Sequence, residues 1–133
     1  MLNVGTDIVA VRRIADALER TGALFRRRVY TSGELDLADA HPDALRFLAT
    51  SFAAKEAVFK ALRPPADGEW DLREIEVGRD SAGAPTVTLH GSLAAHAEAA
   101  GCRRVDLSLS WESEYAVAVA LACVGRAENP GSR

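Results

Sequence analysis

The chain has 133 residues, 48% of them hydrophobic, which is enough for one domain with a buried core and too little for two. Its 16 basic and 19 acidic residues give a formal charge of −3, which argues against general nucleic-acid binding. The amino terminus lacks the pattern of a secretion signal, and the longest apolar run, "YAVAVALACV", is too short to cross a bilayer. We therefore expect neither a nucleic acid nor a membrane as partner.

Basic residues are concentrated near the start of the chain. The first thirty residues contain six arginines: Arg12, Arg13, Arg20, Arg26, Arg27 and Arg28. Such a cluster indicates either an anionic partner or a solvated helix face. Elsewhere, Cys102 and Cys123 have no metal-like or redox-like spacing, so we expect reduced cysteines in a cytoplasmic protein.

The first half of the chain predicts one strand and three helices. The opening "MLNVGTDIV" alternates and predicts a half-buried strand with Leu2, Val4 and Ile8 on its buried face. A helix should follow over 11–20 and end near Gly22.

Two helix starts follow. Thr31 or Ser32 caps the first, with Glu34 in its first turn. The second begins at "HPD" (41–43) and runs to about Leu62, where "RPP" (63–65) stops it.

The second half predicts strands. The segments "REIEVGRD" and "PTVTLH" indicate a hairpin with its turn near Gly83, and a short helix over 92–100 follows. The segments "RRVDLSLSW" and "YAVAVALACV" indicate two more strands, joined by a turn at 112–114, and alternate alanines in the last one would let a helix lie close. The class is α+β, with a long central helix on a mostly antiparallel sheet, in one domain over 1–124 with a flexible tail over 125–133.

The central helix, "SFAAKEAVFKAL", is apolar but carries charges in its middle. At about 100° per residue, Glu56, Lys60 and Arg63 fall on one narrow stripe, whereas Ser51 and Lys55 make a second polar edge. Two interpretations remain open. Glu56 and Lys60 are either an exposed i, i+4 pair worth ~0.3–0.5 kcal/mol, or a carboxylate and an ammonium held beside a ligand.

Asp7 favours the second interpretation. It lies at the end of the first strand, where aspartate has a poor strand propensity. If Asp7 met Glu56, the two carboxylates would repel each other unless a cation lay between them. Mg²⁺ suits such a pair, since it takes one or two carboxylates and completes its shell with waters and phosphate oxygens. Lys60 would then neutralise phosphate charge or protonate a leaving group.

Two motifs carry a family resemblance. "VGTDIVAVRRI" followed by "RFLATSFAAKEAVFKAL" resembles the holo-[acyl-carrier-protein] synthase family of 4′-phosphopantetheinyl transferases. The later "IEV…GAPTVTL" and "VDLSLSW…EYAVAVAL" are similar to that family's second half in order and spacing, so the resemblance covers residues 2–124.

The resemblance implies a transferase. Coenzyme A would donate its 4′-phosphopantetheine arm to a serine of an acyl carrier protein, leaving adenosine 3′,5′-bisphosphate. By the same resemblance Asp7 and Glu56 are Mg²⁺ ligands, Glu56 and Lys60 are the catalytic pair, and Lys55 matches the motif without a defined role. This agrees with the chemistry inferred from the residues, because a metal and a lysine both stabilise charge on an attacked phosphate.

The resemblance also implies partners. Arg13 matches the family's docking arginine for an acidic carrier-protein helix, and Arg28 and Arg46 are expected to assist. Members of the family are similar in forming trimers with coenzyme A in the cleft between subunits, so we expect a homotrimer.

Three departures fall on the expected coenzyme A side. Ser51 replaces an arginine, "RPPADGEW" (63–70) replaces a glycine-rich turn, and Trp111 replaces a histidine at the strand end "SLSW". The expected cofactor-binding residues are Lys60, Arg63, Ser110 and Trp111, with Arg73 as another possible substitute for the lost cations.

Trp111 would either stack on an adenine or simply pack in the core. Two functions stay open: a working transferase with an altered cofactor pocket, or a homologue that binds carrier protein but catalyses another reaction or none.

Overall fold

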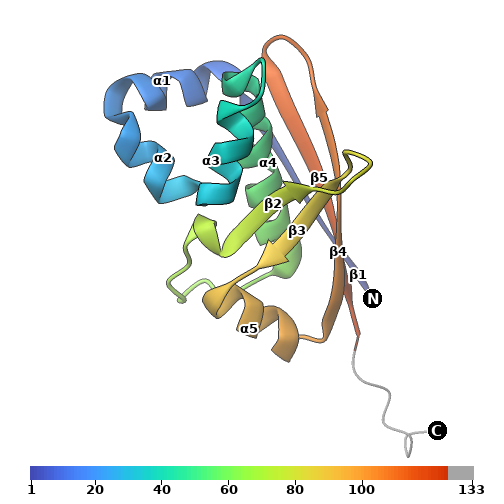
Figure 1. The fold of residues 1–133 in the computed structure, drawn as a ribbon. Coiled ribbons are helices and arrows are strands. Elements are labelled where there is room, and N and C mark those ends of the chain that lie inside the picture. The colour runs from blue at the N-terminus through green and yellow to red at the C-terminus, as the bar shows by residue number, and fades with distance from the viewer. Residues whose placement is uncertain (126–133) are drawn as a thin grey trace, which may run out of the picture.

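The computed structural model describes residues 1–125 and is drawn in Figure 1. The helices are α1 (Val11–Thr21), α2 (Ala23–Val29), α3 (Ser32–Asp39), α4 (Ala44–Leu62), α5 (Gly91–Ala99) and the 3₁₀ helix η1 (Leu72–Glu74). The strands are β1 (Leu2–Ala10), β2 (Ile75–Arg79), β3 (Pro85–Leu89), β4 (Cys102–Trp111) and β5 (Tyr115–Val124). Of the predicted tail over 125–133, residues 126–133 lie outside the described residues, whereas the N–H of Gly125 donates a hydrogen bond to the carbonyl oxygen of Gly101 at 3.0 Å.

The strands form two antiparallel sheets. One has the order β1-β5-β4, and the other is the hairpin β2-β3, with Gly83 in its turn at φ 86°. Helix α4 packs on the inner face of the first sheet, between that sheet and helices α1, α2 and α3 (Figure 1). The predicted α+β class is therefore confirmed, with both sheets wholly antiparallel among the described residues.

The inner face of the three-stranded sheet is built for close approach. Its central strand β5 presents Ala116, Ala118, Ala120 and Ala122, all completely buried. Small side chains leave room for α4, whose buried alanines belong to the same core cluster. The predicted alanine face is confirmed.

The predicted buried face of β1 is wrong. Leu2, Val4 and Ile8 are 64%, 52% and 62% exposed, and the opposite side of the strand faces α4. Gly5 explains which face of β1 packs on α4. A Cβ at this position would collide with the carbonyl oxygen of Ala57, so only glycine lets the helix lie this close. Steric fit to α4 outweighs hydrophobicity at this strand.

The helix starts were predicted well. Thr31 caps α3 in a capping box with Glu34, and Asp43 caps α4 by accepting a hydrogen bond from the Arg46 N–H. The short helix α2 was not predicted, because its seven residues contain three consecutive arginines and too little apolar periodicity.

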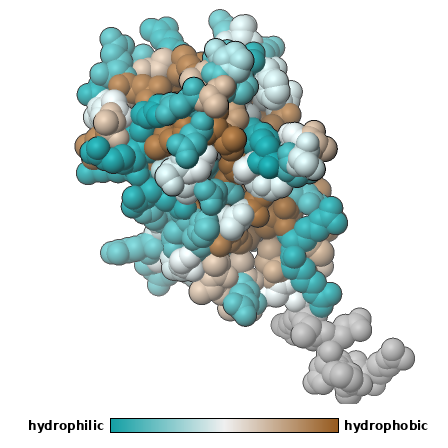
Figure 2. Space-filling view, viewed as in Figure 1, coloured by the Kyte–Doolittle hydropathy of each residue, from teal (hydrophilic) through white to brown (hydrophobic). Residues whose placement is uncertain are grey.

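The surface of the helical side is mixed. Figure 2 shows hydrophobic residues between hydrophilic ones, without one broad apolar area on this face. Among the described residues no helix is both long and apolar enough to cross a membrane.

Candidate functional site

Asp7 reaches the site because of the register of β1. It pairs with Ala118, and residues directly opposite each other in an antiparallel pair point to the same face. Ala118 faces α4, so Asp7 does too, two residues beyond the close contact at Gly5. The strand therefore brings a carboxylate against the central helix.

Lys60 meets this carboxylate from α4. Its Nζ donates hydrogen bonds to Asp7 Oδ1 at 3.1 Å and to the carbonyl oxygen of Thr6 at 2.9 Å. The Asp7 side chain is only 18% exposed, while that of Lys60 is 52% exposed. The pair is consequently open to a ligand on the lysine side.

Glu56 lies one turn before Lys60 and is half-buried. Burial and then the negative charge of Asp7 raise the pKa of Glu56, while Lys60 and Arg13 act in the opposite direction. A carboxylate whose ionisation is opposed by a neighbouring negative charge favours a cation between the two groups. The structure thus brings together Asp7, Glu56 and Lys60 as the sequence predicts.

The carboxylates of Asp7 and Glu56 fit a Mg²⁺ ion that takes its other ligands from water and substrate. Within residues 1–125 no group of three or more histidine, cysteine or acidic side chains could hold a metal. Asp7 and Glu56 alone would leave most of the coordination shell to water and substrate oxygens, which is the arrangement Mg²⁺ accepts most readily.

A hollow of about 290 Å³ adjoins Glu56. Its other walls are Phe59 of α4 and the segment after it, Gly68, Trp70, Asp71 and Leu72. The indole of Trp70 folds back over Gly68 and donates to the carbonyl oxygen of Pro65 at 2.9 Å. The chain's substitute for a glycine-rich turn is therefore an ordered loop closed by an aromatic ring.

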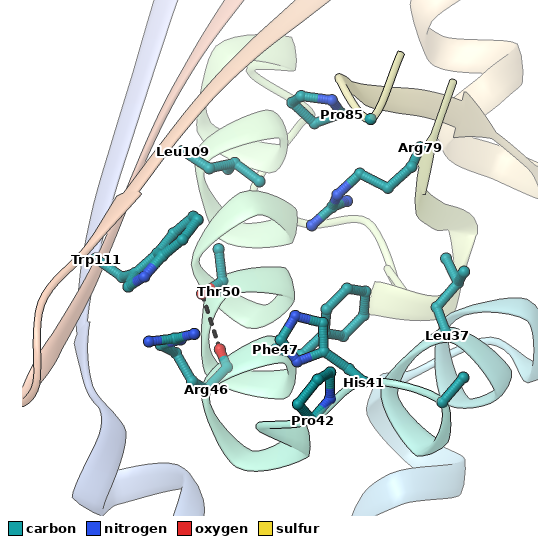
Figure 3. Close-up of a pocket in the computed structure, with 12 residues that line it drawn as sticks. Leu37, His41, Pro42, Arg46, Phe47, Thr50, Arg79, Pro85, Leu109 and Trp111 are labelled. Carbon is teal, nitrogen blue, oxygen red and sulfur yellow. Dashed lines mark hydrogen bonds between the residues drawn. The ribbon is translucent and has the colours of Figure 1, made fainter. Parts of the chain in front are cut away.

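A second hollow, of about 490 Å³, lies on the other flank of α4 and is shown in Figure 3. Trp111 enters it from the end of β4, and the guanidinium of Arg46 lies over the indole at 5.2 Å from the ring centroid. From the hairpin side, the guanidinium of Arg79 lies over Phe47 at 5.0 Å. We call this cavity the Trp111 hollow; it combines flat aromatic surface with two cations.

The four expected cofactor-binding residues do not share one surface within the chain. Trp111 pairs with Ala116 on the inner face of the sheet, so Ser110, its neighbour, points to the outer face. Arg63 is exposed at the far end of α4, with φ 50°, while Arg46 at the start of that helix contacts Trp111. Nineteen helical residues, about 28 Å, separate these two ends.

The three arginines expected to dock the carrier protein also lie on different surfaces. Arg13 lies over Phe52 at 5.8 Å and lines a hollow of about 380 Å³ between α1, α2 and α4, with Arg20 and Phe25. Arg28 is exposed on α2, whereas Arg46 belongs to the Trp111 hollow. The sequence does not predict Phe52 or Phe25 at this surface, because aromatic residues at helical spacing indicate core as readily as a surface hollow.

The predicted second polar edge of α4 is wrong. Ser51 and Lys55 are both fully buried, and the Ser51 hydroxyl has no hydrogen-bond partner among the described residues. Ser51 therefore lines the core and not a cofactor surface in this chain. Lys55 is paired with Glu34, a partner that no spacing in the sequence indicates.

Comparison with known proteins identifies the family of this chain. The family model of the 4′-phosphopantetheinyl transferase superfamily matches residues 3–120. A holo-[acyl-carrier-protein] synthase of Koribacter versatilis is 41% identical over 118 residues, 89% of this chain and 94% of that protein. Another, of Desulforudis audaxviator, is 43% identical over 130 residues, 97% of each chain.

Solved structures give the same result. The holo-[acyl-carrier-protein] synthase of Neisseria meningitidis superposes with a TM-score of 0.83 at 34% identity, covering 90% of this chain and 96% of that one. An ACPS–CoA complex of Chronobacterium ammoniagenes also gives 0.83, at 32% identity, covering 95% and 99%. Family model, relatives and folds agree over nearly the whole chain, which therefore belongs to the holo-[acyl-carrier-protein] synthases of the 4′-phosphopantetheinyl transferase superfamily.

Proposed function

We propose that this chain transfers 4′-phosphopantetheine from coenzyme A to a serine of an acyl carrier protein, in a Mg²⁺-dependent reaction. The observation that carries the proposal is the meeting of Asp7, Glu56 and Lys60 between β1 and α4, in a member of this family. The serine oxygen forms a bond to the β-phosphorus, the diphosphate bridge breaks, the hydroxyl proton is lost, and adenosine 3′,5′-bisphosphate leaves.

Asp7 and Glu56 are the residues that would hold Mg²⁺, and the bound ion would neutralise charge on the diphosphate. Lys60 holds its ammonium beside Asp7 through two hydrogen bonds, which orients it without enclosing it. The lysine can therefore stabilise the charge that develops on the leaving phosphate.

The Trp111 hollow is our candidate for the nucleotide end of coenzyme A. Its indole offers a face for the adenine, and Arg46 and Arg79 offer charge-assisted hydrogen bonds to phosphate. These two arginines are better placed than Arg63 or Arg73 to compensate for the cations missing at positions 51 and 111.

Within one chain, the proposed metal site and the Trp111 hollow do not lie side by side. Asp7 and Trp111 lie on the opposite edge strands β1 and β4, and α4 packs on the sheet between them. We therefore propose a homotrimer in which coenzyme A lies between adjacent subunits, touching the metal side of one and the Trp111 hollow of the next.

The outer face of the sheet supports this assembly. Its exposed apolar residues are Leu2, Val4, Ile8, Val119 and Leu121, which are between 37% and 64% exposed. A contiguous apolar sheet face of this kind is typical of an interface between protein chains.

The carrier protein would dock on α1. Arg13 and Arg20 rim an apolar hollow floored by Phe52 and Phe25, which fits an acidic helix that also presents an apolar side chain. Arg28 would add to the positive field of this surface. Since neither cysteine is in a disulfide, we place the reaction in the reducing cytoplasm.

Intact-mass spectrometry tests the function directly. An apo carrier protein incubated with the chain, coenzyme A and Mg²⁺ should gain the mass of one phosphopantetheine, and a chelator should prevent the gain. Glu56→Gln should abolish it with the fold retained, whereas Glu98→Gln, at an exposed carboxylate of α5, should leave it unchanged. No mass gain, together with no calorimetric binding of coenzyme A, would leave a homologue without transferase activity.

A further inference from the structure

The buried lysine of the central helix has all of its hydrogen-bond donors paired with other groups of the protein. Lys55 has no exposed surface, and its Nζ donates to the carbonyl oxygens of Leu72 at 2.9 Å and Ile75 at 2.5 Å. Its third contact is Glu34 Oε1 at 2.6 Å. An ammonium has three N–H donors, so Lys55 has none left for a substrate.

Glu34 is equally well enclosed. It is fully buried, and its Oε1 also accepts a hydrogen bond from the Thr31 N–H at 2.8 Å. Its Oε2 accepts from the Val77 N–H at 2.9 Å. The carboxylate thus joins the start of α3 and strand β2 to the lysine of α4, with both oxygens satisfied.

The carbonyls bound by Lys55 belong to the segment that walls the hollow beside Glu56. Leu72 lines that hollow, and Leu72 and Ile75 lie at the start and just past the end of η1. Glu56 is the next residue after Lys55. One ammonium therefore ties the wall of the hollow to the helical turn that presents the carboxylate.

We propose that Lys55 is a positioning residue of the transfer reaction: by holding Leu72 and Ile75 against α4, it sets the width of the hollow that receives the part of coenzyme A next to its diphosphate. This rests on the proposed function, because it takes Glu56 to face the diphosphate. A buried ion pair is weak evidence for stability alone, since well-packed apolar residues often replace one at no cost.

The test removes both charges together. Glu34→Gln with Lys55→Met avoids leaving a single buried charge, which would unfold many proteins. We expect kcat/KM for coenzyme A to fall at least tenfold, while KM for the carrier protein changes less than twofold. Leu93→Ala, a core cavity on α5 away from the hollow, serves as the control for lost stability and should keep kcat/KM for coenzyme A.

A folded double variant with wild-type kcat and KM for coenzyme A would overturn the proposal and leave the pair purely structural. Should that variant not fold, Leu72→Ala alters the wall while leaving the ion pair intact. A severalfold fall in kcat/KM for coenzyme A is then expected, and no change would equally overturn the proposal. Failure of the proposed function is separate: it would show as an inactive wild type or a fully active Glu56→Gln.

Discussion

Lys55 and Glu56 are consecutive residues of α4 that meet different surroundings: Lys55 is fully enclosed by Glu34 and two carbonyl oxygens, whereas Glu56 lines an open hollow. One turn further, Lys60 is half-exposed and reaches Asp7. The three charges in the middle of α4 therefore meet two kinds of surroundings. In our proposal Lys55 positions neighbouring elements, whereas Glu56 and Lys60 face the reaction.

The close contact between β1 and α4 makes Gly5 sensitive to any side chain. In Gly5→Ala the new Cβ would collide with the Ala57 carbonyl oxygen and lie 2.7 Å from the Ala61 nitrogen, both of them backbone atoms that cannot rotate away. We expect a loss of about 2 kcal/mol or more in the free energy of unfolding, measured in urea. Thr88→Ala, at an exposed position of β3 away from this contact, should change it by less than about 0.5 kcal/mol. Equal stability of both variants would contradict this packing.

Gly5 also shows why the buried face of β1 was mispredicted. Leu2, Val4 and Ile8 alternate as a buried face should, yet the other face carries the residue small enough for α4. The alanine face of β5 was read correctly, but the pairing of Gly5 with Ala120 cannot be deduced without the strand register. Once that register is known, helix and sheet fit together by size, and the apolar side chains are left for the outer face.

The meeting of Asp7, Glu56 and Lys60 was predictable, because these residues occur in two recognisable motifs. The Lys55–Glu34 pair and the cations of the Trp111 hollow were not. Arg79 and Trp111 come from different sheets, 32 residues apart in sequence, and only tertiary packing brings them near α4. Burial of a charge, as at Lys55, likewise depends on a partner whose position the local sequence does not specify.

Tyr30 gives the fold a specific sensitivity to high pH. Its hydroxyl is buried and donates to the Leu48 carbonyl oxygen at 2.8 Å, and burial raises its pKa well above the ordinary value. In the unfolded chain the tyrosine hydroxyl ionises near pH 10, whereas in the folded protein it stays protonated. The contribution of Tyr30 to the free energy of unfolding is therefore complete below about pH 10 and falls by about 1.4 kcal/mol per pH unit as the pH rises further.

The comparison with Tyr30→Phe isolates this effect, because all other titrations are shared. The variant should be less stable than wild type by about 1 kcal/mol at pH 8, and the difference should shrink or reverse by pH 11 in urea unfolding. A difference that stays constant over this range would mean that Tyr30 ionises normally in the folded protein.

The outer face of the sheet should control assembly. Val4→Lys places a charge in the centre of the apolar face, where Val4 is 52% exposed in the single chain. Light scattering should give a mass near three times 14.2 kDa for wild type and near 14.2 kDa for the variant, with activity lost in parallel. Leu24→Lys, at an equally apolar but isolated position on α2, is the control and should remain trimeric. A monomeric wild type would exclude the proposed shared site.

Arg79 should matter for binding coenzyme A. Its guanidinium lies over Phe47 in the Trp111 hollow, where it can reach a phosphate of the nucleotide end. Because a hydrogen bond to a charged group contributes about 1.5–3 kcal/mol, Arg79→Ala should raise the Kd for coenzyme A roughly tenfold or more by calorimetry. Arg103→Ala, at an exposed position of β4, should leave the Kd unchanged. If Arg79→Ala and Trp111→Ala both bind coenzyme A as wild type does, the nucleotide end lies elsewhere and the Trp111 hollow has another role.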